Sequence, residues 1–278
     1  MHQNRIIVPI DFTIASEQAI AQSLEIARKA NLTIMLLHIL TKESKSSQVK
    51  KGMDSLDTEE RLKNMANSIS EQEGIHCIYN IVPGDIFEEI PVLTNKTENA
   101  LMVIGTHGIQ GIKQKILGAD ILKLVRKISI PCLIVQENCI CKNFSPIVFP
   151  VGGHEGFNAL IDGTAMIAEL FGSEVHIYSI DKKGDTESKE IRTNIQLSER
   201  IFAEKKIPYQ RIKEDSNVFS VGYAKQTLQY AHKVNAGLIS IMSVKSSAHY
   251  YFAQADKESM INNEFEIPVL CANGMFNY

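Results

Sequence analysis

Two short segments in the first half of the chain combine residue types that could hold a phosphorylated ligand. Residues 9–13 read Pro-Ile-Asp-Phe-Thr after an apolar run, and residues 104–108 read Ile-Gly-Thr-His-Gly, with Gly111 and Gly118 further on. Glycines after a strand let the backbone approach a phosphate closely, and N–H groups at the start of the next helix favour an anion. A carboxylate such as Asp11 could hydrogen-bond a ribose or hold a cation. In an open parallel α/β sheet, ligands bind beyond the carboxyl ends of strands, where these segments fall.

Simpler interpretations compete with this one at several positions. Asp11 could cap the helix that follows, because aspartate is a favoured N-cap residue. His107 could be a solvated loop histidine, although its place between two glycines equally suits a phosphate donor. His38 lies inside an apolar run and is expected to be a packed residue at a strand end. The segment 42–51, rich in lysine and serine, is expected to be a surface loop, and a lid over the ligand is the weaker alternative.

Hydrophobic patterning predicts alternating strands and helices around these segments. Apolar runs indicate buried strands, and apolar residues at helical spacing indicate amphipathic helices. Pro91 is expected to bend or restart its helix. The predicted strands are Ile6–Ile10, Thr33–Leu40, Ile75–Val82, Ala100–Ile104 and Cys132–Gln136, and the predicted helices are 15–30, 54–73, Ile86–Lys96 and Ile116–Ile128. Such alternation predicts an α/β fold with parallel sheets covered on both faces and right-handed crossovers.

The second half of the chain repeats the first. Residues 6–10 (Ile-Ile-Val-Pro-Ile) match residues 147–151 (Ile-Val-Phe-Pro-Val) at an offset of 141, and residues 130–135 match 267–272 at an offset of 137. Two halves in nearly constant register indicate a duplication. We therefore predict two tandem domains, residues 1–138 and 145–278, joined by a polar linker around residues 137–145. The apolar fifth strands of the two halves offer edges that could pair and make an intramolecular pseudo-dimer.

Composition excludes several classes of protein. The chain has 278 residues, a net charge of −3, 44% hydrophobic and 22% charged residues, and a pI of about 6.3. These values give no electrostatic reason to expect nucleic acid or an anionic membrane as a partner. No membrane-spanning run and no secretory signal pattern is visible, so a cytoplasmic location is expected.

The five cysteines do not suggest a disulfide framework. Three of them, Cys77, Cys132 and Cys271, lie in apolar strand-like runs and are expected to be buried. Cys139 and Cys141 form a C-x-C pair in a polar stretch. A metal or redox site at that pair is the less favoured interpretation, because no further His or Cys pair lies near it in the sequence.

Taken together, these segments resemble the universal stress protein family over both halves. Residues 9–13 look like its first-strand signature, residues 105–118 look like its nucleotide motif G-x2-G-x9-G-[ST], and residues 130–135 (Ile-Pro-Cys-Leu-Ile-Val) are similar to its fifth strand. The resemblance implies two tandem five-stranded parallel sheets of order 3-2-1-4-5 with helices on both faces. It also implies ATP or AMP between the first and fourth strands, Mg²⁺ with ATP, and contacts through the fifth strand, with a homodimer as a further expectation.

The resemblance also assigns residues to the nucleotide. Asp11 would meet the adenosine, the Ile39 backbone would meet the adenine, and the glycines with His107 would surround the phosphates. The family's final hydroxyl residue is replaced here by Ala119, and one lost hydrogen bond to a charged group costs about 1.5–3 kcal/mol, roughly a ten- to hundredfold loss of affinity. The implied nucleotide-binding residues are Pro9, Ile10, Asp11, Ile39, Ile104, Gly105, His107, Gly108, Gly118 and Ala119.

The second half departs much further from the motif. At the offset of 141, Asp11 aligns with Gly152. At the offset of 137, a side chain replaces each motif glycine: Gly105, His107, Gly108 and Gly118 align with Met242, Val244, Lys245 and Ala255. We expect no nucleotide there and interpret residues 152–154 as a tight turn, with a lining role in another pocket as the alternative.

Three functions are compatible with these features. The favoured one is a stress-response or signalling module that binds an adenine nucleotide in its first domain, with the second domain serving dimerisation or interaction. The alternative is an interaction scaffold in which both sites are inactive. Strong turnover is not expected of the favoured module, because the sequence shows no nucleophile–base pair, no Walker lysine and no paired carboxylates. An adenylate-forming or nucleotide-transferring enzyme of a related α/β family is disfavoured, because the first-strand turn lacks an S-G-G-x-D-type loop and no H-I-G-H-type motif occurs. Slow ATP hydrolysis stays open.

Overall fold

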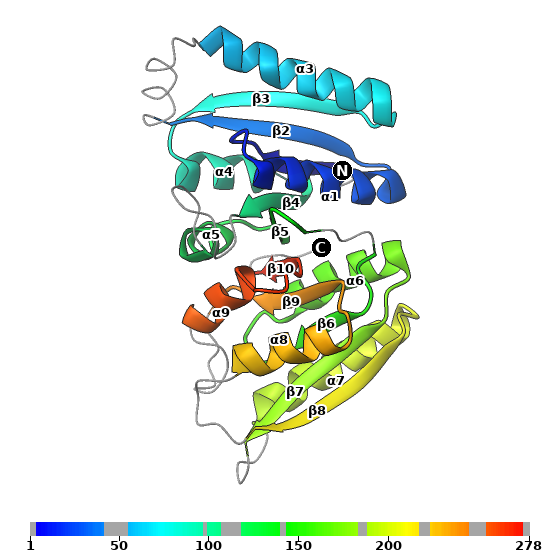
Figure 1. Ribbon diagram of the computed structural model, residues 1–278. Coiled ribbons are helices and arrows are strands. Elements are labelled where there is room, and N and C mark those ends of the chain that lie inside the picture. The colour runs from blue at the N-terminus through cyan, green and yellow to red at the C-terminus, as the bar shows by residue number, and fades with distance from the viewer. Residues whose placement is uncertain are drawn as a thin grey trace.

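The computed structural model describes residues 4–41, 55–96, 99–106, 118–139, 143–182, 188–216, 223–244 and 254–274. Strands and helices alternate along both halves, as predicted (Figure 1). The first half contains β1 (Arg5–Pro9), α1 (Ile14–Ala30), β2 (Thr33–Leu40), α3 (Ser55–Glu73), β3 (Cys77–Pro83), α4 (Ile86–Thr94), β4 (Asn99–Thr106), α5 (Gly118–Val125) and β5 (Cys132–Gln136). The second half contains β6 (Ile147–Pro150), α6 (Asn158–Phe171), β7 (Val175–Lys182), α7 (Lys189–Glu204), β8 (Tyr209–Ser216), α8 (Tyr223–Lys233), β9 (Leu238–Met242), α9 (Gln254–Ile261) and β10 (Val269–Ala272).

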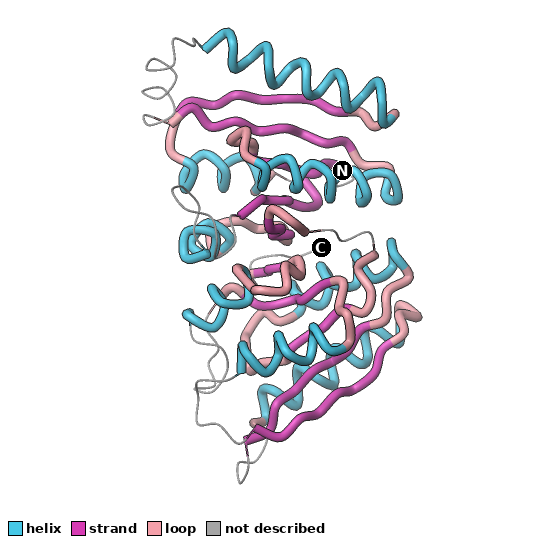
Figure 2. Tube along the Cα trace, viewed as in Figure 1, coloured by secondary structure: helices cyan, strands magenta, loops and turns pink. Residues whose placement is uncertain are grey.

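All ten strands form one sheet in the order β3-β2-β1-β4-β5-β10-β9-β6-β7-β8. Within each half the strands are parallel and follow the order 3-2-1-4-5, which confirms the predicted topology. The two fifth strands pair antiparallel, with Cys132 opposite Cys271 and Ile134 opposite Val269. This pairing, called the seam below, joins the strands of the two halves into one continuous sheet (Figure 2).

Helices cover both faces of this sheet. In the second half, α8 lies in front of the strands and α6 and α7 lie behind them in the view of Figure 1. Two helix pairs cross the seam, because α1 contacts α6 and α5 contacts α9. The strands beneath these helices are almost wholly apolar and buried, as expected when helices cover both faces.

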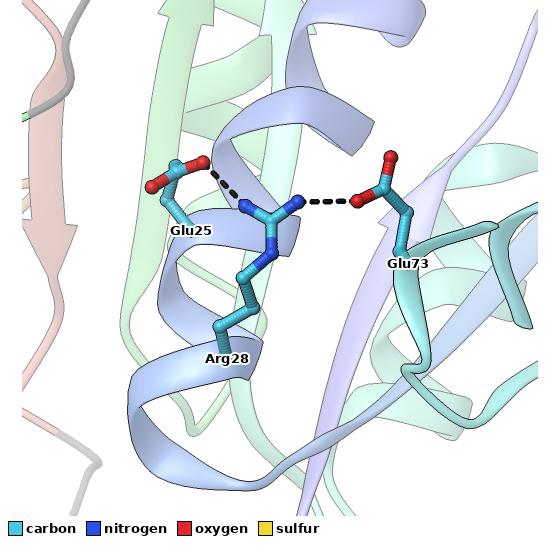
Figure 3. A network of polar contacts seen from close by, with 3 residues as sticks. All are labelled: Glu25, Arg28 and Glu73. Atoms are coloured by element: carbon cyan, nitrogen blue, oxygen red, sulfur yellow. Dashed lines mark hydrogen bonds and ion pairs between the residues drawn. The ribbon is translucent and has the colours of Figure 1, made fainter.

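Local chemistry explains the bounds of α1. The Thr13 side chain caps its first turn, and Asn31 ends it in the left-handed conformation. At the far end of the helix, the guanidinium of Arg28 contacts Glu25 at 2.6 Å and Glu73 of α3 at 2.5 Å (Figure 3). These side chains are partly exposed, so the network contributes little free energy, but it joins the carboxyl-terminal ends of α1 and α3.

The helix does not restart at Pro91, although a restart was one of the two expected outcomes. Residues 86–94 form one helix with Pro91 inside it. Proline cannot donate to the carbonyl four residues earlier, which belongs to Phe87. The ammonium of Lys127 donates to that carbonyl at 3.0 Å, so the helix continues without an unpaired acceptor.

The cysteine predictions are confirmed where they can be examined. Cys77, Cys132 and Cys271 are buried, and so is Cys139, whereas Cys141 lies outside the described residues. Within the described ranges, no group of three or more His, Cys, Asp or Glu side chains is placed to hold a metal ion. None of the described helices is long and apolar enough to span a membrane.

Candidate functional site

The structure brings the two ligand-suited segments to one edge of the sheet. β1 and β4 are neighbouring parallel strands, so their carboxyl ends meet at the same edge. The turn after β1 (residues 10–13), the end of β4 at Gly105 and Thr106, and the start of α5 at Gly118 belong to this edge, called the first site below. His107 and Gly108 lie outside the described residues.

Asp11 shapes the turn after β1. One of its carboxylate oxygens accepts from the Thr13 backbone N–H at 3.1 Å and from the Thr13 hydroxyl at 2.6 Å. The Thr13 oxygen in turn accepts from the Ser16 backbone N–H at 3.4 Å, so Thr13 is the N-cap of α1. The alternative in which Asp11 caps this helix is therefore wrong. The Asp11 side chain remains exposed, and a ligand can reach it.

An aromatic and basic group borders this turn. Phe12 has a positive φ of 63°, its ring centroid lies 5.1 Å from that of His38, and the Arg61 guanidinium lies 4.2 Å above its ring. A positive φ at a bulky residue is strained, so the surrounding contacts must hold Phe12 in place. This conformation was not predictable from local sequence patterns, because it depends on packing between the turn and α3.

His38 is a packed strand-end residue, as predicted. It is buried, and its Nδ1 lies 2.7 Å from the Ile10 carbonyl oxygen. A carbonyl only accepts, so Nδ1 carries the proton and Nε2 is left as an acceptor. Burial lowers the pKa of His38, which keeps the ring neutral. Nε2 has no hydrogen-bond partner among the described residues.

The apolar residues assigned to the site contribute backbone rather than side chain. Ile10, Ile39 and Ile104 are buried in the core, and Pro9 is half-buried at the end of β1. The Ile10 N–H already donates to the Leu37 carbonyl at 2.8 Å. Recognition of a ligand by these positions would therefore use the remaining main-chain groups at the strand ends.

Gly105 has a structural role that needs no ligand. A Cβ added at this position would lie 2.1 Å from the Ala15 carbonyl oxygen and 2.8 Å from the Ser16 nitrogen. The first turn of α1 therefore rests directly on the backbone of β4. The interpretation of Gly105 as a phosphate glycine omitted this contact, because the approach of the helix is a tertiary feature.

The start of α5 carries an acidic side chain that the motif analysis overlooked. Gly118 and Ala119 open the helix, and Asp120 follows in its first turn. A carboxylate there interacts favourably with the helix dipole, but it repels a phosphate bound at the same end of the helix. The signal was visible in the sequence as an acid two residues after the last motif glycine.

A groove on the described surface lies beside the first site. It has a volume of about 710 Å³ and runs between the amino-terminal part of α1 and most of the length of α3. Arg61, which covers the Phe12 ring, is one of its walls. The groove is lined by Glu17, Ile20, Asp57, Glu60, Arg61, Asn64, Met65, Ser68 and Ile69. It is not above Gly105, so we treat it as a neighbour of the first site.

The chain itself occupies part of the corresponding region of the second half. Gly156 adopts a positive φ of 64°, and a Cβ there would lie 2.6 Å from the Gly274 Cα, so the loop after β6 rests on the segment after β10. The Asn194 amide holds this loop by donating to the carbonyls of Gly152 at 2.7 Å and His154 at 3.0 Å. Met242 stands buried where the first half has Gly105. Residues 152–154 are thus part of a buried turn, and Lys245 lies outside the described residues.

Each half also touches the edge of the other. Near the first site, Thr106 donates to the Asn262 side-chain oxygen at 3.4 Å, and Gln136 donates to the Asn263 carbonyl at 2.8 Å. At the opposite edge, Arg126 donates to the Ser243 carbonyl at 3.0 Å, and Asn273 donates to the Val125 carbonyl at 2.8 Å. These pairs follow from the antiparallel seam, which places the end of each half's last helix beside the strand ends of the other half.

The fold is that of a tandem α/β protein. Its first half places polar residues and glycines at the carboxyl edge of the sheet, where parallel α/β sheets bind ligands. A model of the universal stress protein family matches residues 3–136, so the first half of the chain is a domain of that family. No curated protein sequence matches the chain.

Solved structures support the same architecture over the whole length. A universal stress protein from Archaeoglobus fulgidus aligns with a TM-score of 0.73 and 17% identity, covering 99% of this chain and 100% of the other. A putative universal stress protein from Pseudomonas aeruginosa aligns with a TM-score of 0.62 and 17% identity, covering 97% and 93%. At these identities the similarity shows the fold alone.

Proposed function

We propose that this protein is a stress-response or signalling module whose first site binds an adenine nucleotide, ATP or AMP. The observation that carries the proposal is the meeting of the Asp11–Thr13 turn, the end of β4 at Gly105 and the start of α5 at one sheet edge. This is the location where parallel α/β sheets bind ligands. The second half would serve assembly and interaction, and a cytoplasmic location fits such a role.

The carboxylates around the first site set a requirement on the ligand. Asp11 is exposed in the turn, and Asp120 lies in the first turn of α5, where phosphates would be held. Unscreened repulsion between two charges 4 Å apart is about 1 kcal/mol even in water. We therefore expect ATP to bind together with Mg²⁺, and AMP to depend less on the cation.

Calorimetric titration of the whole chain with AMP, ADP and ATP, with and without Mg²⁺, tests this proposal. Asp11→Ala should weaken binding at least tenfold, because it removes both the carboxylate and the anchor of the turn. Asp85→Asn is a matched control, since Asp85 caps α4 in the same half and asparagine caps equally well. Asp120→Asn should tighten binding of Mg²⁺-free ATP several-fold.

A scaffold with both sites inactive is the second candidate. Ala119 removes a phosphate contact, Asp120 adds a repulsive charge, and the second half folds its own loop into the corresponding region. Absence of heat with all three nucleotides at high protein concentration would favour this candidate and reject nucleotide binding.

A further inference from the structure

A group of basic side chains, two of them buried and one half-buried, lies at the edge of the second half that corresponds to the first site. It consists of His154 in the loop after β6, Lys257 in the first turn of α9, and Arg126 just after α5 of the other half. His154 is 5% exposed and Lys257 is 1% exposed. These three residues are called the basic cluster below. They come from three separate segments, so their meeting is a product of the fold and of the seam.

The three side chains converge on the end of β9. Lys257 donates its ammonium to the Val244 carbonyl, and Arg126 donates its Nε to the neighbouring Ser243 carbonyl at 3.0 Å. The His154 ring approaches the Val244 carbonyl as well, without making a hydrogen bond of good geometry. The cluster is therefore compact, although its members are far apart in the sequence.

Several polar atoms of the cluster have no hydrogen-bond partner among the described residues; in the neutral His154 ring, one nitrogen is a donor and the other an acceptor. The Arg126 Nη2 and both ring nitrogens of His154 are buried and have no hydrogen-bond partner among the described residues. Lys257 uses one of its three donors on Val244. Buried polar groups are normally satisfied, and an unsatisfied group indicates a bound water or ion that the protein atoms alone do not supply.

The charge of the cluster is also unbalanced. Burial and the charge of Arg126 lower the pKa of Lys257 to about 8, and burial together with Lys257 lowers the pKa of His154 to about 3. Asp256 and the Cys271 thiol act on Lys257 through space, but no ion pair joins Lys257 or Arg126 to a carboxylate within the described ranges. A buried cation without a compensating anion is destabilised, and a bound anion would stabilise it.

The same position in the repeat carries the opposite charge in the first half. Lys257 aligns with Asp120 at the offset of 137, and Gly152 aligns with Asp11 at the offset of 141. The first site thus has two carboxylates at its edge, whereas the second half has lost both and acquired cations. Arg126 adds a further positive charge across the seam.

From this convergence of unpaired, buried donors, we propose that the second half binds a small oxyanion of the phosphate class in the basic cluster. Lys257 and Arg126 would supply the charge, and His154 would donate one ring N–H. This site differs from the proposed nucleotide site. Here side chains from both halves would bind the anion, whereas in the first site backbone groups of the glycines would bind the phosphates. Its ligand must be small, since the loop after β6 rests against Gly274.

Titration of inorganic phosphate into the full chain tests the proposal, with heat and thermal unfolding as readouts. We expect one phosphate per chain, at least tenfold weaker binding in Lys257→Met, and weaker binding in Arg126→Gln. Lys123→Met is the matched control, because Lys123 lies exposed on α5 and should leave phosphate binding unchanged. Circular dichroism checks that each variant is folded, and Arg126→Lys should retain part of the binding if Arg126→Gln does not fold.

Competition separates this site from the first one. Saturating AMP and the Asp11→Ala variant should both leave phosphate binding intact, whether or not nucleotide binding itself is found. Displacement of phosphate by AMP would place the ion in the first site and overturn the proposal. Absence of any binding up to about 10 mM phosphate, or unchanged binding in Lys257→Met, would overturn it as well.

The pH dependence provides a second readout, with sulfate as a probe that does not titrate in this range. Lys257 is charged below a pH of about 8, so sulfate affinity should fall as the pH rises through that value. Arg126, Asp256 and Cys271 are the other groups that act on Lys257, and His154 stays neutral over the same range because burial and Lys257 lower its pKa to about 3. Burial and Lys257 set the pKa of Cys271 at about 12, so its thiol does not titrate there. A sulfate affinity that is constant between pH 6 and 9 would contradict the role of Lys257.

Discussion

The contact between β4 and α1 makes Gly105→Ala an informative perturbation. The added methyl carbon would lie 2.1 Å from the Ala15 carbonyl oxygen and 2.3 Å from its carbon. Both atoms belong to the backbone, so no side-chain rotation can relieve the overlap. Overpacked cores usually lose 1–3 kcal/mol, and a clash with fixed backbone belongs at the upper end, about 3 kcal/mol. For a chain of this length that corresponds to roughly 6–12 °C in Tm.

Urea unfolding without nucleotide measures this effect, with two glycine variants for comparison. Gly237→Ala would place its methyl 2.2 Å from the Asn143 carbonyl oxygen in the second half, so a similar loss of stability is expected there, with the first site unaffected. Gly172→Ala has a positive φ of 64° but no neighbouring atom within 4 Å, and should cost only about 1–2 kcal/mol. If Gly105→Ala were no more harmful than Gly172→Ala, the close approach of α1 to β4 would be wrong, and Gly105 would be explained by ligand binding alone.

Three further predictions concern the site and the core. Ala119→Ser should tighten ATP binding by up to about 3 kcal/mol in calorimetry and change AMP binding little. Equal changes for ATP and AMP would show that the serine does not act on the terminal phosphates. Burial raises the pKa of Cys77 and of Cys271 to about 12 and also raises that of Cys132. An alkylating reagent at pH 7.5 should therefore label these three thiols only after unfolding. Rapid labelling of the native protein would contradict their burial. Without added oxyanion, Lys257→Met should stabilise the chain at pH 7 by up to about 3 kcal/mol, because the folded state lowers the lysine pKa from 10.5 to about 8. The unfolded state binds more protons between these pH values, so the advantage should shrink as the pH rises from 8 to 10.5, and a constant difference would refute the assignment.

The elements were predictable from local patterns and the pairing of the two halves from the repeat, whereas the strand order 3-2-1-4-5 was predicted from the family resemblance alone. Buried runs such as Thr33–Leu40 predicted the strands, and the matching Ile-Pro segments at residues 130 and 267 predicted paired fifth strands. The structure confirms both. Domain boundaries and nucleotide-binding residues stay predictions.

The missed features depend on how distant segments pack. The need for glycine at position 105 arises from the approach of α1 to β4. The Phe87 carbonyl that Pro91 leaves without a helical donor is paired by the Lys127 ammonium, which comes from beyond α5. Lys257 lies in a short, largely polar helix and would be expected to face solvent. Its burial follows from the packing of α9 against α5 across the seam, which no single helix reveals.

The seam places the two fifth strands in a single polypeptide, and this changes how the pair of domains assembles. Two separate subunits would meet at a rate set by their concentration, whereas tethered halves meet at a fixed, high effective concentration. Dilution therefore cannot separate β5 from β10, and unfolding of the chain should be first order. Residues 269–271 of the second half make the strand pairs that cover the edge of the first half. The motif glycines lie in other segments, so a duplicated half without them would still cover that edge. The second copy can thus keep its strand edge while the sequence of its loops diverges.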